Sequence, residues 1–322
     1  MLKVEANDVN INRAVEILRR GFLVAFPTET VYGLGADGLN PLAVAKIFEA
    51  KKRPAFNPLI LHVADRNMLN LIAEVNNPKV EKLIEKFWPG PLTLVLPKKA
   101  IVPDIVTAGN STVAVRMPDH PIALKLIKAY QFPLAAPSAN AFSQLSPTTA
   151  QHVVNQLGEN VNFILDGGSC SVGVESTILK ITDDEVVLLR PGGLPIEEIE
   201  KVIGKVVIKE IHDELPIAPG MLPFHYSPNT TFKLINEINP DELDGKKVGA
   251  IFLKENSTGR NFEVEKILSK SGDLPEAAAN LFGFLHELEE LDLDIIIAET
   301  VEEEGLGRAI MDRLRKAAKR YE

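Results

Sequence analysis

A five-residue apolar run, Phe22 to Phe26, is the segment that most constrains how this chain can fold. Such a run is typical of a buried strand, and Pro27 ends it by removing a donor of the strand ladder. The polar residues that follow, Thr28 to Tyr32, then lie on the loop that leaves the carboxyl end of the strand. Open α/β sheets bind ligands at such ends, so this loop is the first candidate for a functional site.

A helix with a cluster of cations at its end is expected next. Asn40 and Pro41 are typical of a helix start, and apolar residues continue at helical spacing as far as Phe48. Three cations, KKR at residues 51–53, follow at the carboxyl end. Cations there complement the helix dipole, and most such clusters have no other function, so on their own they indicate catalysis only weakly.

A second buried strand is expected at residues 59–63, with His62 in an otherwise apolar sequence. A histidine within a strand is more often a satisfied core residue than a ligand-binding one. Because the polar loop and the cations are close in sequence, both interpretations of His62 remain open.

The glycines at residues 33–38, GLGADG, match the G-x-G-x-x-G pattern of dinucleotide-binding folds. That fingerprint requires the first glycine to follow the strand directly and to open the helix. Here residues 27–32 intervene, and the helix starts only after Gly38. We therefore interpret these glycines as loop conformers that allow close backbone approach, and not as a nicotinamide site.

Two more polar stretches adjoin expected strands. Thr112 precedes a strand at residues 113–117 that contains Arg116. An arginine in an alternating strand can simply point to solvent, and this interpretation is favoured at first. A further strand at residues 133–136 leads into the polar sequence PSAN at residues 137–140.

Ser146 is expected to be the N-cap of a helix at residues 150–157, because its residue type favours that position and Pro147 follows it. A free helix amino terminus also binds phosphate, so capping and phosphate binding are compatible. Periodicity predicts the remaining helices at residues 9–21, 68–75, 80–87, 122–130, 274–291 and 306–319, and the remaining strands at 92–96, 163–166, 176–181, 186–190, 247–253 and 295–299. This alternation indicates the α/β class, with a small second α/β domain at the end of the chain.

The composition is that of a globular protein long enough for two domains, with 45% hydrophobic and 25% charged residues among 322. No apolar run reaches the roughly 18 residues of a membrane span, and the amino terminus lacks the apolar core of a signal peptide. A cytoplasmic protein is therefore expected. The single cysteine, Cys170, excludes an internal disulfide framework, and the spacing of the six histidines indicates no metal site.

The stretch between the two expected domains has an unusual composition. Residues 208–230 are dotted with prolines, as in a linker, but they also carry Met221, Phe224, His225 and Tyr226. These side chains are too apolar for a solvated spacer, so the stretch is expected to lie against another part of the protein.

Three groups of motifs together resemble the Sua5/YrdC family of threonylcarbamoyl-AMP synthases. They are PTETVYGL with KKRPAFNPL at residues 27–59, APSAN with SPT at 136–148, and APGMLPFHYSP at 218–228. The resemblance covers essentially the whole chain. It implies a YrdC-like, twisted, open mixed sheet with flanking helices at residues 1–208, a linker or lid at 209–230, and a small Rossmann-like Sua5 domain at 231–322.

The resemblance also implies a reaction. The family joins L-threonine, bicarbonate and ATP into threonylcarbamoyl-AMP and releases pyrophosphate. A downstream transferase then passes the threonylcarbamoyl group to adenosine 37 of tRNAs that read ANN codons. The product is thus an intermediate of tRNA modification.

The family's residue roles transfer to matching positions of this sequence. The K-x-R element corresponds to Lys51 and Arg53, for which the resemblance implies a catalytic role, with Lys52 in place of the usual glycine. The residues implied to hold threonine are Thr30, His62, Arg116, the backbone at Ala136, and Ser176. Those implied to hold the nucleotide are Arg53, Asn57, Thr112, Ser138, Asn140, Ser146, Arg190, His225 and Tyr226.

The residue types suit this chemistry. Phosphoryl transfer needs positioning and cations more than a covalent nucleophile. Mg²⁺ is expected to arrive on the ATP phosphates, because the sequence shows no carboxylate cage. Carbamate and mixed anhydride both react with water, so a lid is expected, with Tyr226 as the first and His225 as the second candidate to cover the nucleotide.

Two other function classes fit the sequence less well. An RNA-binding factor of the tRNA pathway is disfavoured as the main role by the net charge of −9 and by the absence of interleaved arginine and aromatic residues, although weak tRNA binding stays open. A P-loop enzyme is disfavoured because no G-x-x-x-x-G-K-[S/T] sequence occurs.

Overall fold

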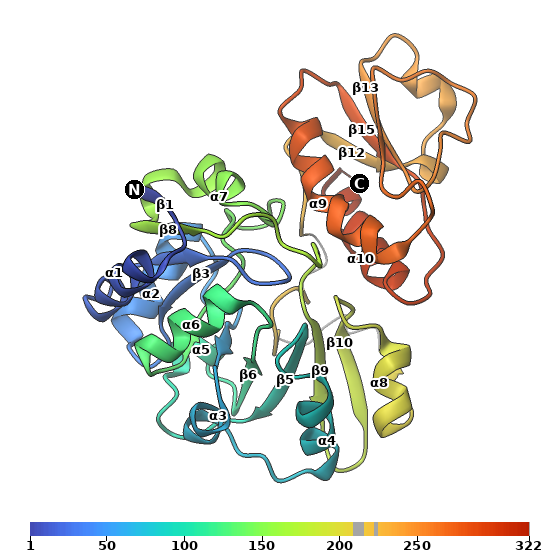
Figure 1. The fold of residues 1–322 in the computed structure, drawn as a ribbon. Helices are drawn as coiled ribbons and strands as arrows, with labels where there is room; N and C mark the ends of the chain where they lie inside the picture. Colours follow the sequence, from blue (N-terminus) through green and yellow to red (C-terminus); the bar gives the residue numbers. More distant parts are fainter. Residues whose placement is uncertain (209–215, 222–224, 322) are drawn as a thin grey trace.

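The structure, a computed structural model, describes residues 1–208, 216–221 and 225–321 (Figure 1). Within these residues the strands form two separate sheets. The larger, mixed sheet consists of β1 (Leu2–Glu5), β2 (Val24–Phe26), β3 (Gly33–Asp37), β4 (Ile60–His62), β5 (Leu92–Pro97), β6 (Thr112–Arg116), β7 (Leu134–Ala135), β8 (Phe163–Asp166), β9 (Thr177–Ile181), β10 (Val186–Arg190) and β11 (Val207–Ile208). Its spatial order is β1-β8-β2-β3-β7-β4-β6-β5-β9-β10-β11.

Helices flank this sheet and bury its apolar side chains. α1 packs against α6, α2 against β3 and α5, and α4 against α8. The helices of this part of the chain are α1 (Asp8–Arg19), α2 (Pro41–Lys51), α3 (Arg66–Ile72), α4 (Pro78–Phe87), α5 (Asp104–Thr107), α6 (Pro121–Tyr130), α7 (Ala150–Leu157) and α8 (Ile196–Ile203), with a 3₁₀ turn at Gly158–Asn160. The expected class, a mixed α/β sheet with flanking helices, is confirmed.

Residues 231–321, called the C-terminal region below, form a smaller α/β unit. Its parallel strands lie in the order β12-β15-β13-β14. The elements are β12 (Thr231–Leu234), β13 (Val248–Phe252), β14 (Val264–Ile267), α9 (Leu274–Glu289), β15 (Ile295–Ala298) and α10 (Gly307–Ala318), with 3₁₀ turns at Ile235–Glu237, Pro240–Leu243 and Lys319–Tyr321. In Figure 1, α9 and α10 lie on the side of the small sheet that faces the large one.

The glycine-rich sequence after β2 corrects one expectation. Residues 33–37 form strand β3, so Gly33 and Gly35 are not loop conformers, whereas Gly38 lies in the turn that follows; none of the three has a positive φ. The predicted close approach is confirmed: a Cβ on Gly35 would lie 2.7 Å from Phe26 Cε1, and one on Gly38 would lie 2.6 Å from Leu61 Cδ2. These glycines therefore serve packing within the sheet.

The expected cap of α7 is also wrong. Thr149 is the N-cap, and its side chain accepts a hydrogen bond from the amide of His152 at 3.2 Å. Ser146 is fully buried and directs its hydroxyl elsewhere. The preference of serine for caps was outweighed by a threonine nearer the helix and by a buried partner for Ser146.

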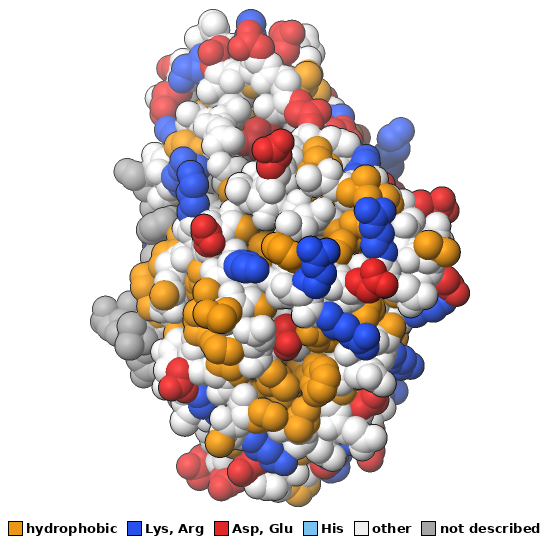
Figure 2. Space-filling view, turned by 90° about the vertical axis from the view of Figure 1, so that its left-hand side faces the viewer, with side chains coloured by type: hydrophobic (Ala, Val, Ile, Leu, Met, Phe, Trp, Pro, Cys, Tyr) orange, Lys and Arg blue, Asp and Glu red, His pale blue; other side chains and the backbone are white. Residues whose placement is uncertain are grey.

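The surface carries mixed charge. Figure 2 shows acidic side chains gathered at the upper end of the molecule, which the C-terminal region forms, and hydrophobic side chains over the lower half of this face. Within the residues that the structure describes, no helix is long and apolar enough to cross a membrane.

Candidate active site

A narrow cavity of about 40 Å³ lies between the large sheet and the residues that lead to the C-terminal region. β4 and β6 are parallel and place His62 opposite Arg116 at their carboxyl ends, so both side chains reach the cavity together. The lining residues are Thr28, Thr30, Val31, Tyr32, Gly33, Arg53, Ile60, His62, Arg116, Ala136, Pro137, Ser138, Glu175, Ser176, Arg190, Pro219, Gly220, His225 and Tyr226.

Arg116 is buried in the cavity wall, which overturns the solvent-facing interpretation and agrees with the place in the site that the resemblance implies. Its Nη1 donates to Thr30 Oγ1 at 2.8 Å, and its Nε donates to the carbonyl of Gly90 at 3.2 Å. Its Nη2 lies 2.7 Å from Glu29 Oε1. The guanidinium is thus held in a fixed orientation by a hydroxyl, a carbonyl and a carboxylate.

His62 is a cavity residue and not a satisfied core histidine. Its Nδ1 has no hydrogen-bond partner among the described residues, although only 3% of the residue is exposed. Burial, and then the charge of Arg116, lowers the pKa of His62 to about 3. At neutral pH its imidazole is therefore uncharged and has a free ring nitrogen near a fixed cation.

Lys51 is buried at the end of α2 and holds a neighbouring loop. Its Nζ donates to the carbonyl of Ser138 at 2.6 Å, to the carbonyl of Asn140, and to Asn140 Oδ1 at 3.2 Å. Burial, and then the charge of Arg53, lowers the pKa of Lys51 well below its usual value. The K-x-R and S-x-N elements are therefore in direct contact, with Lys51 outside the cavity lining.

Arg53 reaches the cavity from the turn after α2. Its Nε donates to the carbonyl of Asn57 at 3.1 Å and its Nη2 to that of Pro58 at 2.9 Å. The side-chain amide of Asn57 is buried and has no hydrogen-bond partner in the part of the chain that the structure describes. Buried polar groups without partners are rare, so Asn57 is available to a ligand or a water molecule.

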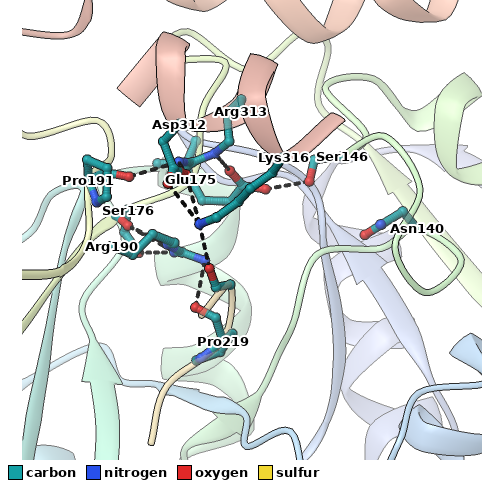
Figure 3. Close-up of polar contacts among 12 residues, drawn as sticks. Asn140, Ser146, Glu175, Ser176, Arg190, Pro191, Pro219, Asp312, Arg313 and Lys316 are labelled. Atoms are coloured by element: carbon teal, nitrogen blue, oxygen red, sulfur yellow. Dashed lines mark hydrogen bonds and ion pairs between the residues drawn. The ribbon is translucent and has the colours of Figure 1, made fainter. Parts of the chain in front are cut away.

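Arg190 fixes Ser176 on the opposite wall. Its Nε and Nη2 donate to the carbonyl of Ser176 at 3.1 and 2.9 Å, and Nη2 also lies 3.1 Å from Ser176 Oγ (Figure 3). Its Nη1 is 3.4 Å from the carbonyl of Pro219. Arg190 therefore connects the strand end to the described part of the expected linker.

Sequence reasoning missed Glu175, which lines the cavity, and Arg313, which contacts Glu175 from behind the wall. Arg313, on α10, donates from Nε to Glu175 Oε2 at 2.7 Å, and the hydroxyl of Ser146 donates to Glu175 Oε1 (Figure 3). Although burial acts to raise it, the charges of Arg313 and Arg190 lower the pKa of Glu175 to about 2. A lone acid before the strand at 177–181 was a signal in the sequence, but nothing local indicated its partner 138 residues away.

The described end of the linker lies against the cavity. His225 and Tyr226 are buried, with ring centroids 4.0 Å apart, and Tyr226 adopts a φ of 63°. Tyr226 Oη and His225 Nδ1 have no hydrogen-bond partner among the described residues. The expectation that this stretch contacts another part of the protein is confirmed for these two residues, whereas Phe224 and the rest of 209–215 and 222–224 lie outside the described residues.

The structure brings together most, but not all, of the residues implied by the motifs. All five of the threonine group, Thr30, His62, Arg116, Ala136 and Ser176, line the cavity. Of the nucleotide group, Arg53, Ser138, Arg190, His225 and Tyr226 line it, whereas Asn57, Thr112, Asn140 and Ser146 do not. Thr112 begins β6 at the end opposite Arg116, whereas Asn140 accepts a hydrogen bond from Lys51 and Ser146 donates one to Glu175.

No three His, Cys, Asp or Glu side chains of the described residues are grouped so that they could hold a metal ion. The two carboxylates nearest the cavity, Glu29 and Glu175, are each paired with an arginine. Cys170 is buried and does not line the cavity, and burial raises the pKa of its thiol. The described site therefore consists of cations, hydroxyls, amides and neutral rings.

Two family models match the chain. The Sua5_yciO_yrdC model, described as "Telomere recombination", matches residues 16–192, and the model "Threonylcarbamoyl-AMP synthase, C-terminal domain" matches residues 194–319. Threonylcarbamoyl-AMP synthases of Pyrococcus abyssi and Bacillus subtilis are 46% and 44% identical to this chain. These alignments cover 96% and 98% of this chain and 94% and 95% of the two relatives.

Solved structures agree with this match. The crystal structure of P. abyssi Sua5 complexed with L-threonine superposes with a TM-score of 0.91 at 45% identity, over 99% of this chain and 96% of that one. The crystal structure of Escherichia coli YciO, at 26% identity and a TM-score of 0.54, covers 59% of this chain and 94% of its own. Fold and cavity together define a two-part α/β protein with a buried polar cavity. The chain belongs to the Sua5 family of threonylcarbamoyl-AMP synthases.

The contacts of Lys51 generate a prediction about stability. Lys51→Met should lower the free energy of unfolding by about 1–3 kcal/mol, because it leaves the buried carbonyls of Ser138 and Asn140 without a donor. Lys52→Met, the same change at an exposed neighbour, should change it by less than about 0.5 kcal/mol. Urea unfolding followed by the fluorescence of the single tryptophan, Trp88, measures both; equal values for the two variants would contradict the structural role.

Proposed function

We propose that this chain is an L-threonylcarbamoyl-AMP synthase, which converts L-threonine, bicarbonate and ATP into threonylcarbamoyl-AMP and pyrophosphate. The observation that carries the proposal is a set of buried polar atoms without partners beside buried arginines. His62 Nδ1, His225 Nδ1 and Tyr226 Oη are all of this kind, and all three residues line the cavity. Such atoms are costly unless a ligand satisfies them, so the cavity suits a small, polar and anionic ligand.

The end of the cavity around Arg116 is the proposed threonine site. Arg116 presents a fixed guanidinium to the threonine carboxylate, and the hydroxyl of Thr30 lies beside it. The neutral imidazole of His62 can accept a hydrogen bond from the amine or the hydroxyl of threonine. The Ser176 hydroxyl and the backbone at Ala136 complete this group.

The end around Arg53 and Arg190 is the proposed nucleotide site. Both guanidinium groups are buried in the wall, where they can neutralise phosphate charge. Ser138 lines this end, and Asn57, Thr112, Asn140 and Ser146 are assigned supporting positions around it. ATP enters with Mg²⁺ on its phosphates, since the two carboxylates near the cavity already have arginine partners.

The chemistry then requires positioning and not a covalent enzyme intermediate. Bicarbonate loses hydroxide to form CO₂, and the threonine amine attacks the carbon of this CO₂. The proton lost by the amine combines with the hydroxide to form water, which leaves a carbamate. A carbamate oxygen attacks the α-phosphorus of ATP in line, and the bond to the β,γ-pyrophosphate breaks with its electron pair leaving on pyrophosphate. The cations stabilise charge that develops on the phosphate oxygens, and Lys51 acts by holding the 138–140 loop at the nucleotide.

The proposed reaction predicts a strict substrate requirement. Pyrophosphate should form from ATP only when both L-threonine and bicarbonate are present, because the carbamate is the only nucleophile. The measurement is pyrophosphate release with each of the twenty amino acids, with and without bicarbonate. Release at the same rate without threonine would refute the proposal, and tight, salt-sensitive tRNA binding without turnover would identify an RNA-binding factor instead.

The assigned role of Arg53 predicts a kinetic effect. Arg53→Ala should lower turnover by roughly tenfold to a thousandfold, the range for the loss of one electrostatic stabiliser. Lys52→Gly is the matched control, because Lys52 is exposed and has a φ of 52°, which glycine adopts freely. If folded Arg53→Ala keeps wild-type turnover, as the control does, the cations only complement the helix dipole.

We propose that the linker between residues 209 and 230 is a lid, between a catalytic domain at 1–208 and a second domain at 231–322. Support comes from the burial of His225 and Tyr226 in the cavity wall and from the carbonyl of Pro219 near Arg190. His225, Tyr226 and Pro219 form the cavity wall on the linker side, so a movement of the linker would open this side to ATP.

The lid predicts ligand-dependent protection. Amide exchange at residues 216–221 and 225–228 should slow when ATP and threonine are added, because the linker then closes over both substrates. Tyr226→Ala should lose this protection and most of the turnover. Exchange that is the same with and without substrates would mean that the linker is only a tether.

The reactivity of the product indicates which protein acts after this enzyme. Threonylcarbamoyl-AMP is a reactive mixed anhydride, so a downstream threonylcarbamoyl transferase must consume it and modify tRNA. We place the enzyme in the cytoplasm with that transferase, and direct tRNA binding by this chain is at most weak. Transfer of label from threonine to tRNA in a mixture of both proteins tests this context, and no transfer despite pyrophosphate release would refute it.

A further inference from the structure

The C-terminal region places a buried arginine directly behind the wall of the cavity. Arg313, on α10, is only 1% exposed and is among the largest fully buried side chains. Its Nε bonds Glu175, and its Nη1 donates to the carbonyl of Pro191 at 2.9 Å and to Asp312 Oδ2 at 2.6 Å (Figure 3). Its Cζ lies 4.9 Å from the centre of the Tyr226 ring. Arg313 therefore contacts two cavity residues without itself lining the cavity.

The ion pair with Glu175 is the contact of Arg313 that bears on ligand binding. It lines the cavity, adjoins Ser176, and lies within electrostatic range of Lys51, Arg190 and His225. An unpaired negative charge at this place would repel the phosphates of ATP and compete with them for the same cations. The charge must therefore be compensated from a side that ATP does not occupy.

We propose that Arg313 is a positioning residue for the nucleotide: it is the ion-pair partner of Glu175 and leaves the cations of the cavity free for phosphate. Its approach from α10, behind the cavity wall, fits this role, since it reaches the carboxylate without occupying the site. This inference rests on the proposed function. It assigns the C-terminal region a direct part in ATP binding.

The neighbouring contacts keep α10 in place for this role. Lys316 donates to the carbonyl of Gly220 at 2.8 Å, and the hydroxyl of Ser227 donates to the carbonyl of Ala317 at 3.2 Å. His286 on α9 lies 3.1 Å from the carbonyl of Ser146, whose hydroxyl bonds Glu175. Docking of the C-terminal region is thus already provided by groups other than Arg313, so a contact made only for docking would be replaceable.

The test compares ATP binding by full-length variants, measured by calorimetry with Mg-ATP. Arg313→Gln should weaken ATP binding by about tenfold or more, because Glu175 then keeps an uncompensated buried charge. Threonine binding measured without ATP should change less than about threefold. Arg315→Gln is the matched control: Arg315 lies on the same helix, is exposed and pairs with Glu303, so both affinities should stay at wild-type values.

A second change separates charge compensation from a merely structural role. Glu175→Gln in the Arg313→Gln background should restore ATP affinity to within about threefold of Glu175→Gln alone, since no carboxylate is left to compensate. This comparison of two variants also decides the matter if Arg313→Gln alone does not fold. A double variant that binds ATP tenfold more weakly than Glu175→Gln would overturn the proposal.

Two other outcomes are distinguishable. If Arg313→Gln is less stable but binds ATP as Arg315→Gln does, Arg313 only holds the C-terminal region in place and the inference is wrong, while the proposed function stands. If the wild-type protein neither binds ATP nor releases pyrophosphate with threonine and bicarbonate, the proposed function is wrong and this inference falls with it.

Discussion

Buried positive charge at one cavity is the constraint on which the rest of this structure depends. Lys51, Arg53, Arg116, Arg190 and Arg313 are each at most 7% exposed. Among the residues that the structure describes, they form ion pairs with only three carboxylates, those of Glu29, Glu175 and Asp312. Backbone carbonyls satisfy most of the remaining donors. A buried cation surrounded by dipoles alone is costly, so the loops that supply these carbonyls must be held rigidly by the sheet.

This constraint explains why proline and glycine are frequent in the loops around the cavity. The carbonyls of Pro58, Gly90 and Pro191 each accept a bond from a buried arginine. Proline restricts the backbone and contributes no amide donor of its own, so its carbonyl can be fixed at lower entropic cost. An excess of cations that is compensated by dipoles leaves the site ready for an anion, because phosphate adds the charge that the protein itself does not provide.

Most of the sheet could be predicted because its signals are local. Apolar runs such as 22–26 and 59–63 predict their strands correctly, and Asn40 with Pro41 fixes the start of α2. β3 was missed because GLGAD has no strand propensity, and its glycines are explained only by contacts with Phe26 and Leu61 from other strands. The edge strands β1 and β11 were missed because they are short and largely exposed, so burial leaves no pattern in their sequences.

The site residues, too, could be predicted where the signal is local and were missed where it depends on contacts between distant segments. Residues in continuous motifs could be assigned from the resemblance, and the cavity contains most of them. Strand periodicity alone could not orient Arg116, because a strand arginine faces solvent or core depending on which partners the fold brings to it, here Glu29 and Thr30. Only the resemblance assigned it to the site. Glu175 and Arg313 are separated by 138 residues, and no local pattern connects two charges at that distance.

The position of Arg313 has a thermodynamic consequence for the two parts of the chain. Coupling between two binding equilibria is reciprocal. If the pair of Arg313 and Glu175 tightens ATP binding by some factor, bound ATP favours the docked position of α10 by the same factor. Tyr226 connects the linker to the docked C-terminal region. Its ring contacts Arg313 of α10, and the ring centre of Phe282 of α9 is 5.7 Å from its own. If the docking of the C-terminal region depends on the nucleotide, a lid attached to this region would close in response to ATP itself. Such closure would protect the carbamate from water.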